Sequence, residues 1–424
     1  MNKSIFYNIL YIIRIFISIV FLIFSTIGIL GFFYPLNLFS LQIPNLLLAI
    51  FNSVDSFSIF ILFFIILFVF LFGNFYCSTL CPLGCSQEIC TLFKTKKSEY
   101  IKPNFFRYFI LTLYLSLFFL GLGCFIKYIN PYFIFSSTFN SSIISIFILV
   151  LVLIFALFKN RLFCRLLCPI GALLGFISKF SLLSLQINSN CIKCGKCERV
   201  CSYSCIDFKN SLIENEICSN CLKCLSVCEH NAVEYKFSPK IKPDFNIDRR
   251  NFIIGTFSLL AIGSLIKHSS KNLFNKILSE VCLILPPNSL DKTKFINTCI
   301  NCGLCVNTCP SKIIKNDDSQ FPYLHFEYHG GYCKEDCNKC ATVCPTAAIK
   351  NFRIADKHKI KIGEARVVSS DCTHCDLCVK ACYYNAITKN YLDLPKIDKD
   401  KCIGCGACKV VCDSNTIEIF AIKD

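Results

Sequence analysis

The sequence predicts a multi-domain chain in which an α-helical membrane domain precedes small α+β modules folded around cysteines. Two observations lead to this fold class. Long apolar runs are concentrated before residue 187, in a chain of 424 residues with 54% hydrophobic side chains. Many of the 33 cysteines follow a repeated pattern, Cys-x2-Cys-x2-Cys-x3-Cys, which suits metal clusters better than disulfides. We therefore expect one membrane part followed by soluble modules.

Four apolar runs within residues 1–187 are each close to the ~20 residues that a helix needs to cross a bilayer. They cover residues 12–33, 57–72, 105–126 and 143–158. Lys and Arg are almost absent from the loops after the first and third runs, and several follow the second and fourth. By the positive-inside rule, the N-terminus and both basic stretches are cytoplasmic. The sequence thus predicts a four-span domain, with Arg14 snorkelling from one end of the first span.

A short motif, Cys-x3-Cys-Pro, follows the second and the fourth apolar run. One copy contains Cys77 and Cys81, and the other contains Cys164 and Cys168. A helix that continued through the motif would place both sulfurs on one face, at positions i and i+4. Two such pairs on adjacent helices would bring four thiolates together at the membrane surface. We expect a redox site there; the alternative is that these are structural cysteines at helix ends.

The first soluble module, residues 188–247, contains two complete cysteine motifs. They match the two-cluster bacterial ferredoxin pattern, in which the fourth cysteine of each motif reaches the other motif's cluster. The predicted ligand sets are Cys191, Cys194, Cys197 with Cys228, and Cys218, Cys221, Cys224 with Cys201. Zinc is the alternative metal, but zinc prefers isolated Cys-x2-Cys pairs. Cys205 is expected to pack near a cluster.

Residues 248–266 resemble a twin-arginine (Tat) export signal, with Arg249 and Arg250 followed by a short apolar run. Iron–sulfur clusters are built on reduced thiolates in the cytoplasm, so a protein that carries them has to be exported already folded. No Ala-x-Ala follows, and we expect the segment to remain as a fifth span. The alternative is a helix lying against the membrane, which would leave the rest of the chain in the cytoplasm.

The second soluble module, residues 267–424, contains four further motifs. Their predicted ligands are Cys299, Cys302, Cys305, Cys309, Cys333, Cys337, Cys340, Cys344, Cys372, Cys375, Cys378, Cys382, Cys402, Cys405, Cys408 and Cys412. The four motifs form two pairs that share ligands. Either each motif pairs with its neighbour in sequence or the pairs are nested, and the sequence leaves both arrangements open. Together with the two motifs of the first module, these four motifs predict six [4Fe-4S] clusters.

A β-branched aliphatic residue stands five positions after the last cysteine of every motif. These residues are Ile206, Val233, Ile314, Ile349, Ile387 and Ile417. A helical turn followed by a strand would aim each of these side chains at a cluster and shield the cluster from water.

Several functions are disfavoured by the sequence. The net charge of +16 falls on membrane-flanking residues and on modules that would carry anionic clusters, so it does not indicate nucleic-acid binding. All six histidines lie outside the four apolar runs and no Cys-x-x-Cys-His occurs, so we expect no haem. We find no acid–base pair and predict no catalytic residues, which favours an electron-transfer component over a stand-alone enzyme.

The order of these motifs resembles that of two known proteins joined in one chain. Residues 1–247 resemble NapH, the membrane ferredoxin-type subunit of periplasmic nitrate reductase systems, and residues 248–424 resemble its partner NapG. The same pair is similar to MauN and MauM of methylamine utilisation, and the first half is similar to NosR and CcoG. This chain departs from the usual arrangement, in which the two proteins are separate chains.

The resemblance implies a multi-pass protein of the bacterial inner membrane, with the first ferredoxin domain in the cytoplasm and the C-terminal domain in the periplasm. It implies quinol dehydrogenase activity, with electrons delivered to a periplasmic cytochrome c or molybdenum reductase. Two alternatives stay open. One is a redox maturation factor for a periplasmic enzyme, and the other is a cytoplasmic-facing metal reductase similar to CcoG.

Overall fold

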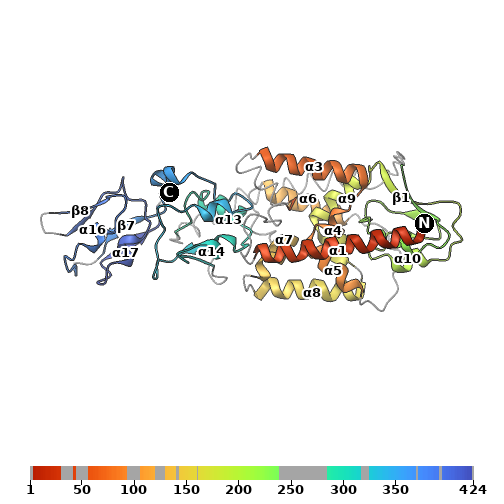
Figure 1. The fold of residues 1–424 in the computed structure, drawn as a ribbon, viewed down its shortest axis with the longest axis horizontal. Coiled ribbons are helices and arrows are strands. Elements are labelled where there is room, and N and C mark those ends of the chain that lie inside the picture. Colours follow the sequence, from red (N-terminus) through yellow and green to blue (C-terminus); the bar gives the residue numbers. More distant parts are fainter. Residues whose placement is uncertain are drawn as a thin grey trace.

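The chain is elongated, with a helical bundle in the middle and a cysteine-rich module at each end (Figure 1). The structure is a computed structural model that describes residues 3–29, 42–43, 56–92, 106–119, 129–139, 143–159, 161–237, 284–316, 324–368, 371–390 and 394–422. The first module lies at the same end as the N-terminus, and the second module lies at the opposite end. The predicted Tat-like segment, residues 248–266, lies outside the described residues.

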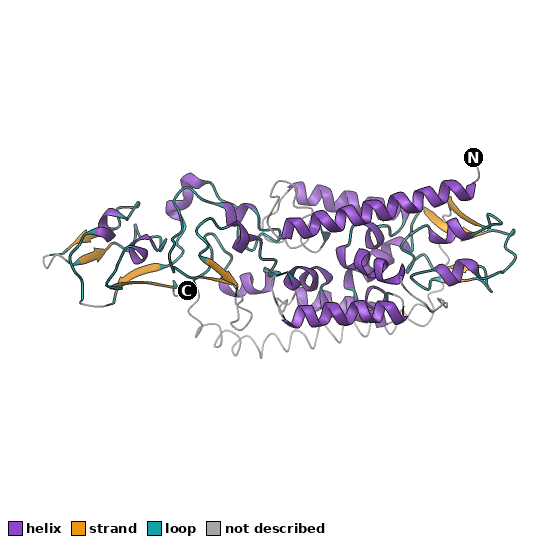
Figure 2. Cartoon of the chain, turned by 60° about the horizontal axis from the view of Figure 1, so that its bottom comes forward, coloured by secondary structure: helices purple, strands orange, loops and turns teal. Residues whose placement is uncertain are grey.

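The bundle contains a helix at each of the four predicted apolar runs. These are α1 (Lys3–Ile29), α3 (Ser56–Phe72), α6 (Phe106–Phe119) and α8 (Ile143–Lys159). Shorter helices complete it: α4 (Tyr76–Thr79), α5 (Pro82–Leu92), α7 (Pro131–Thr138), the π-helix η3 (Phe163–Leu167) and α9 (Pro169–Ser178). The bundle separates the two strand-containing ends in both views (Figure 2).

Membrane crossing is supported for fewer helices than the sequence predicts. Among the described residues, α1 alone is long and apolar enough to span a bilayer, over Phe6–Ile29, and a signal sequence near the N-terminus would have the same character. α7 and α8 form a second such span only together, across a bend of 118°. With 17 residues, α3 is about 26 Å long, shorter than the ~30 Å hydrocarbon core. The four-span architecture is therefore not established.

One prediction for the bundle is wrong. Arg14 does not snorkel toward solvent, because it is 8% exposed and forms an ion pair with Glu88 of α5. The apolar run around Arg14 gives no indication of this distant carboxylate.

The first module consists of two small antiparallel sheets and two helical turns. Its elements are β1 (Leu183–Ile187), α10 (Lys196–Val200), β2 (Ile206–Asp207), β3 (Leu212–Ile213), α11 (Lys223–Val227) and β4 (Val233–Phe237). β1 pairs with β4 from Leu183 opposite Phe237 to Ile187 opposite Val233, and β2 pairs with β3. The connector that precedes the first motif thus closes the module as its edge strand.

The second module repeats this plan with three two-stranded antiparallel sheets, β5–β6, β7–β10 and β8–β9. Its first half contains α13 (Lys292–Thr298), α14 (Leu304–Thr308), β5 (Ile314–Asn316), β6 (Leu324–Phe326), α15 (Lys339–Thr342) and the 3-10 helix η4 (Ile354–Lys359). Its second half contains β7 (Glu364–Val367), α16 (Leu377–Lys380), β8 (Ile387–Lys389), β9 (Pro395–Ile397), α17 (Ala407–Val410) and β10 (Ile417–Phe420).

The second module packs against the end of the bundle remote from the first module. Ile300 and Leu304 share one buried core with Ile29 and Ile43. The Asn307 amide also donates to the last carbonyl of α1, that of Ile29, over 3.2 Å. α1 therefore runs from the first module to the second (Figure 1).

Candidate metal centres

Each of the six cysteine motifs folds as a loop, a single helical turn and then a tight reversal. The third cysteine lies in the turn, in α10, α11, α14, α15, α16 and α17. Three residues after the fourth cysteine, the backbone always has a positive φ, between 48° and 53°. These residues are Ser204, Asn231, Lys312, Ala347, Asn385 and Asn415. Sequence reasoning missed this reversal, although the recurrence of Asn, which tolerates left-handed backbone, was a usable signal.

In the first module the structure brings together the two predicted sets of cysteines. Cys191, Cys194, Cys197 and Cys228 line one pocket. Cys201, Cys218, Cys221 and Cys224 line a second pocket. Cys205 also lines the second pocket, and its sulfur lies 3.4 Å from that of Cys201. The extra cysteine therefore packs where the sequence predicts.

In the second module the motifs pair with their sequence neighbours, which decides between the two arrangements left open. Three pockets are each lined by four cysteines, three from one motif and the fourth from its neighbour. These sets are Cys333, Cys337, Cys340 with Cys309; Cys372, Cys375, Cys378 with Cys412; and Cys402, Cys405, Cys408 with Cys382. Cys302 and Cys305 each interact electrostatically with Cys299 and with Cys344, which completes the first pair. As in the first module, each fourth cysteine crosses to the partner motif.

The aliphatic residue five positions after each motif lies where the sequence predicts. All six are at most 5% exposed. Five line the pocket that contains the fourth cysteine of their own motif. The sixth, Ile349, directs its backbone N–H at the sulfur of Cys344 over 3.5 Å. Similar bonds run from Ala232 to Cys228, at 3.2 Å, and from Ala386 to Cys382, at 3.3 Å.

These sites have the chemistry that a polynuclear iron–sulfur cluster requires. Burial raises the pKa of Cys340 and of Cys408 to about 12 and that of Cys405 to about 11, so near neutral pH these thiols keep their protons until a bound cation displaces them. Within the described ranges, no group of three His, Cys, Asp or Glu is placed to hold a single metal ion. Each pocket is lined by four cysteines that come from two motifs, an arrangement that fits a cluster better than zinc.

The two Cys-x3-Cys-Pro motifs also bring their thiols together, but not on continuous helices as predicted. α4 ends at Thr79 and η3 at Leu167, and new helices begin at Pro82 and Pro169. A proline at the first position of a helix needs no hydrogen-bond partner, which explains the break at this point. Cys77, Cys81 and Cys168 lie in one buried core with Cys164 packed against it, and we call these four cysteines the bundle quartet.

Every sulfur of the bundle quartet accepts one N–H group. Backbone amides of Gly84 and Gly171 donate to Cys81 and Cys168, at 3.4 and 3.3 Å. Side-chain amides of Asn74 and Gln87 donate to Cys77 and Cys164, at 3.5 and 3.3 Å. Such donors stabilise sulfur that carries negative charge, as bound thiolate does.

Both glycines are required by close packing within their motifs. A Cβ added at Gly84 would lie 2.1 Å from the carbonyl oxygen of Cys77, and one added at Gly171 would lie 2.7 Å from that of Cys164. The same packing in both copies shows that the sequence repeat is also a structural repeat.

Comparison with protein families identifies iron–sulfur domains along the chain. A 4Fe-4S binding domain matches residues 55–98 and again 142–187, the two segments that contain the bundle quartet. A 4Fe-4S dicluster domain matches residues 298–348, and further 4Fe-4S binding domains match 188–204, 365–388 and 395–418. No solved structure matches the chain.

Several ferredoxin-type proteins are related to this chain. It is 28% identical to the methylamine utilization ferredoxin-type protein MauM of Methylophilus methylotrophus, over 39% of this chain and 82% of that protein. It is 29% identical to the ferredoxin-type protein NapF of Escherichia coli K12, over 32% of this chain and 82% of that protein. It is 30% identical to NapF of Haemophilus influenzae, over 42% of this chain and 96% of that protein. The chain therefore belongs to the family of ferredoxin-type iron–sulfur proteins that includes NapF and MauM.

Proposed function

We propose that this ferredoxin-type electron-transfer protein is a membrane-bound polyferredoxin that passes electrons from quinol to a periplasmic reductase. The observation that carries the proposal is the position of the cysteines. Four-cysteine sets lie in modules at both ends of an apolar bundle, and the bundle quartet lies within it. A chain with redox sites on both sides of an apolar layer is suited to moving electrons across a membrane.

The cysteines at the ends are proposed as the ligands of six [4Fe-4S] clusters, in the crossed sets described above. When bound, such clusters accept and release single electrons at potentials set by their surroundings. The protein contributes buried thiols, N–H donors to sulfur and the six aliphatic side chains that exclude water. The bundle quartet is proposed as a further redox site, supported by its four N–H donors.

The outer surface of the bundle supports a membrane location. Large apolar side chains are well exposed on three helices: Ile12 and Phe16 on α1, Phe57 and Phe60 on α3, and Phe147 and Phe158 on α8, all at 63–67%. Exposed apolar surface of this extent is costly in water and is typical of lipid contact. In the proposed orientation the first module is cytoplasmic and the second is periplasmic.

A second candidate is a redox maturation factor for a periplasmic enzyme. It is favoured by the several MauM proteins among the relatives, which are described as methylamine utilization proteins. Both candidates use the same cysteines, so they differ in the acceptor and not in the site.

The proposal is tested with the full-length protein, loaded anaerobically and reconstituted in liposomes with a reduced menaquinone analogue. Each quinol that becomes quinone releases two protons and supplies two electrons. We expect the visible absorbance of the clusters to bleach, with two electrons taken up per quinol oxidised. If dithionite reduces the clusters but quinol leaves them oxidised, quinol is not the electron donor. If the clusters bleach with quinol and are then reoxidised by added cytochrome c, electron transfer from quinol to a periplasmic acceptor is supported.

A further inference from the structure

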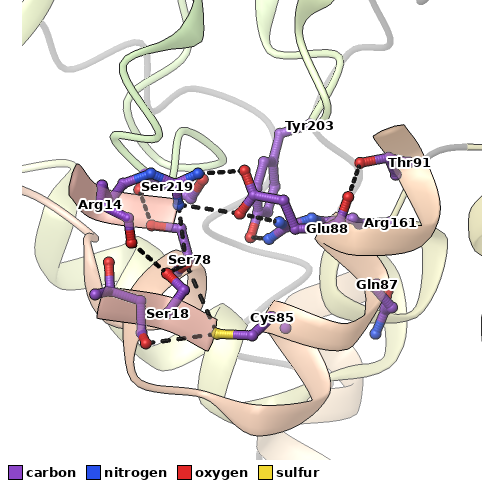
Figure 3. Close-up of polar contacts among 12 residues, drawn as sticks. Arg14, Ser18, Ser78, Cys85, Gln87, Glu88, Thr91, Arg161, Tyr203 and Ser219 are labelled. Carbon is purple, nitrogen blue, oxygen red and sulfur yellow. Dashed lines mark hydrogen bonds and ion pairs between the residues drawn. The ribbon is translucent and has the colours of Figure 1, made fainter. Parts of the chain in front are cut away.

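A buried ion network lies where the bundle meets the first module, and Figure 3 shows its side chains. It joins Arg14 of α1, Glu88 of α5 and Arg161, which lies two residues before η3. Arg14 bonds both carboxylate oxygens of Glu88, with 3.0 Å from Nη1 to Oε2, and Arg161 Nη2 lies 2.6 Å from Oε2. The three side chains are 9%, 7% and 0% exposed. One carboxylate thus accepts hydrogen bonds from two guanidinium groups. We call these three residues the Arg–Glu–Arg bridge.

One side of the bridge contacts the first module. The guanidinium of Arg161 bonds the Tyr203 hydroxyl and lies 4.4 Å from the centre of its ring. Tyr203 lines the pocket of Cys201, Cys218, Cys221 and Cys224. Arg161 is also close enough to Cys221 to interact with it electrostatically.

The other side of the bridge reaches the bundle quartet. Arg14 Nη1 donates to the Ser78 carbonyl, next to Cys77, over 2.9 Å. Gln87, the neighbour of Glu88, donates to the sulfur of Cys164. Arg161 also interacts electrostatically with Cys77 and Cys164.

The bridge carries a net charge of +1, since two guanidinium cations face one carboxylate. An unbalanced charge is expensive to bury unless an opposite charge is close. The sites on both sides are sets of cysteines that would be anionic with clusters bound. Charge near a cluster is one of the factors that set its reduction potential.

We propose that the Arg–Glu–Arg bridge raises the reduction potential of the sites on both of its sides, the bundle quartet and the pocket of Cys201, Cys218, Cys221 and Cys224. The two arginines and Glu88 act as positioning residues. Their positive charge stabilises the extra electron at the junction between bundle and module. The inference rests on the proposed clusters, but it does not depend on quinol as the donor or on the identity of the acceptor.

The test is a redox titration of the full-length protein followed by EPR, using chemical mediators instead of quinol. The signal of the pocket is assigned by its loss in Cys224→Ala. Removing a positive charge with Arg161→Gln should lower the potential of this signal, and removing the negative charge with Glu88→Gln should raise it. We expect each change to alter the ratio of reduced to oxidised cluster at least tenfold at fixed potential, about 59 mV for one electron.

Two controls isolate the effect of charge. Arg161→Lys keeps the charge and should stay close to the wild-type potential. Lys196→Gln removes a cation that is 45% exposed and paired with Glu229 beside the module's other pocket, so solvent screening should leave the potential of the titrated signal nearly unchanged.

Shifts of opposite sign in Arg161→Gln and Glu88→Gln support the proposal. Shifts of the same sign, or no shift with the cluster intact, would overturn it. If Arg161→Gln does not retain its cluster, Glu88→Gln decides alone, and a potential that is unchanged or lower overturns the proposal. Because the titration uses mediators, its outcome is independent of whether quinol reduces the protein.

Discussion

At the scale of single residues, the cluster sites depend on neighbours that are not ligands. The aliphatic residue after each motif closes the pocket, and N–H groups face several of the sulfurs. Their positions follow from local geometry, because a left-handed residue turns the chain and, in five of the six motifs, a strand begins two residues later; Ile349 instead forms an isolated bridge with Ser289. The motif and its strand therefore form one unit that the sequence specifies over a few consecutive positions.

Replacing Ile417, which is 1% exposed, by Thr should admit water to the pocket of Cys372, Cys375, Cys378 and Cys412. Better hydration of the more negative reduced state should raise the potential of that cluster. Loss of the buried methyl group and burial of a hydroxyl should cost about 2 kcal/mol of stability. Mediated titration with EPR measures the potential. Ile422→Thr, at a side chain that is 45% exposed, is the matched control, and equal shifts in both variants would contradict the shielding role.

Gly84→Ala and Gly171→Ala should each disrupt the bundle quartet, because the new methyl group meets a backbone carbonyl that cannot move independently. We expect a loss of about 1–3 kcal/mol in each, measured as thermal stability in detergent. Gly330→Ala is the control, since nothing lies within 4 Å of its Cβ position and the cost is that of its positive φ alone. Wild-type stability in both quartet variants would mean that the motif packs differently.

At the scale of secondary-structure elements, helix ends and breaks position the sites. Pro82 and Pro169 start new helices inside the motifs where the sequence suggested continuous ones, and the break places Cys168 at the cap of α9. α3 ends where the first module docks. The amide of Asn220 and the hydroxyl of Tyr235 both donate to the Phe72 carbonyl, the last of that helix.

Tyr235→Phe removes one of these donors and should weaken the docking of the first module on α3. Since Tyr235 lies in β4, we expect faster hydrogen exchange in β1 and β4, equivalent to about 1 kcal/mol. Tyr383→Phe is a suitable control, because Tyr383 is 68% exposed in the second module. Unchanged exchange in Tyr235→Phe would show that the hydroxyl does not hold the module in place.

At the scale of the whole molecule, the two modules lie at opposite ends of the apolar bundle (Figure 1). The orientation predicted from loop charges puts the first module in the cytoplasm. An opposite location for the second module then requires the chain to cross the membrane after residue 237, within residues that the structure does not describe.

A reporter fused after Asp424 should be active outside the cytoplasm, because the proposed export signal carries folded proteins across the membrane. Changing Arg249 and Arg250 to Lys should retain the reporter inside, and changing Arg353 and Arg366 to Lys should not. A reporter that is internal in all three proteins would rule out export and assign every cluster to a cytoplasmic acceptor.

The sequence was sufficient for features encoded locally and insufficient for those that depend on distant contacts. Motif spacing predicts the six sets of cysteines and their aliphatic neighbours because both lie within a few residues. The sequential pairing in the second module was not predictable, since Cys382 and Cys402 approach one another only in the folded chain. The burial of Arg14 is not predictable for the same reason, because its partner Glu88 is far away in sequence.

The crossed fourth cysteines have a mechanical consequence. A cluster bound by Cys191, Cys194, Cys197 and Cys228 would close a long covalent loop, and its mate would close a shorter loop inside it. Such ties restrict the unfolded chain as disulfides do, and this matters because each sheet has only two short strands. Loss of one cluster of a pair would therefore loosen the chain that holds its mate, so oxidative damage to one cluster would destabilise the other.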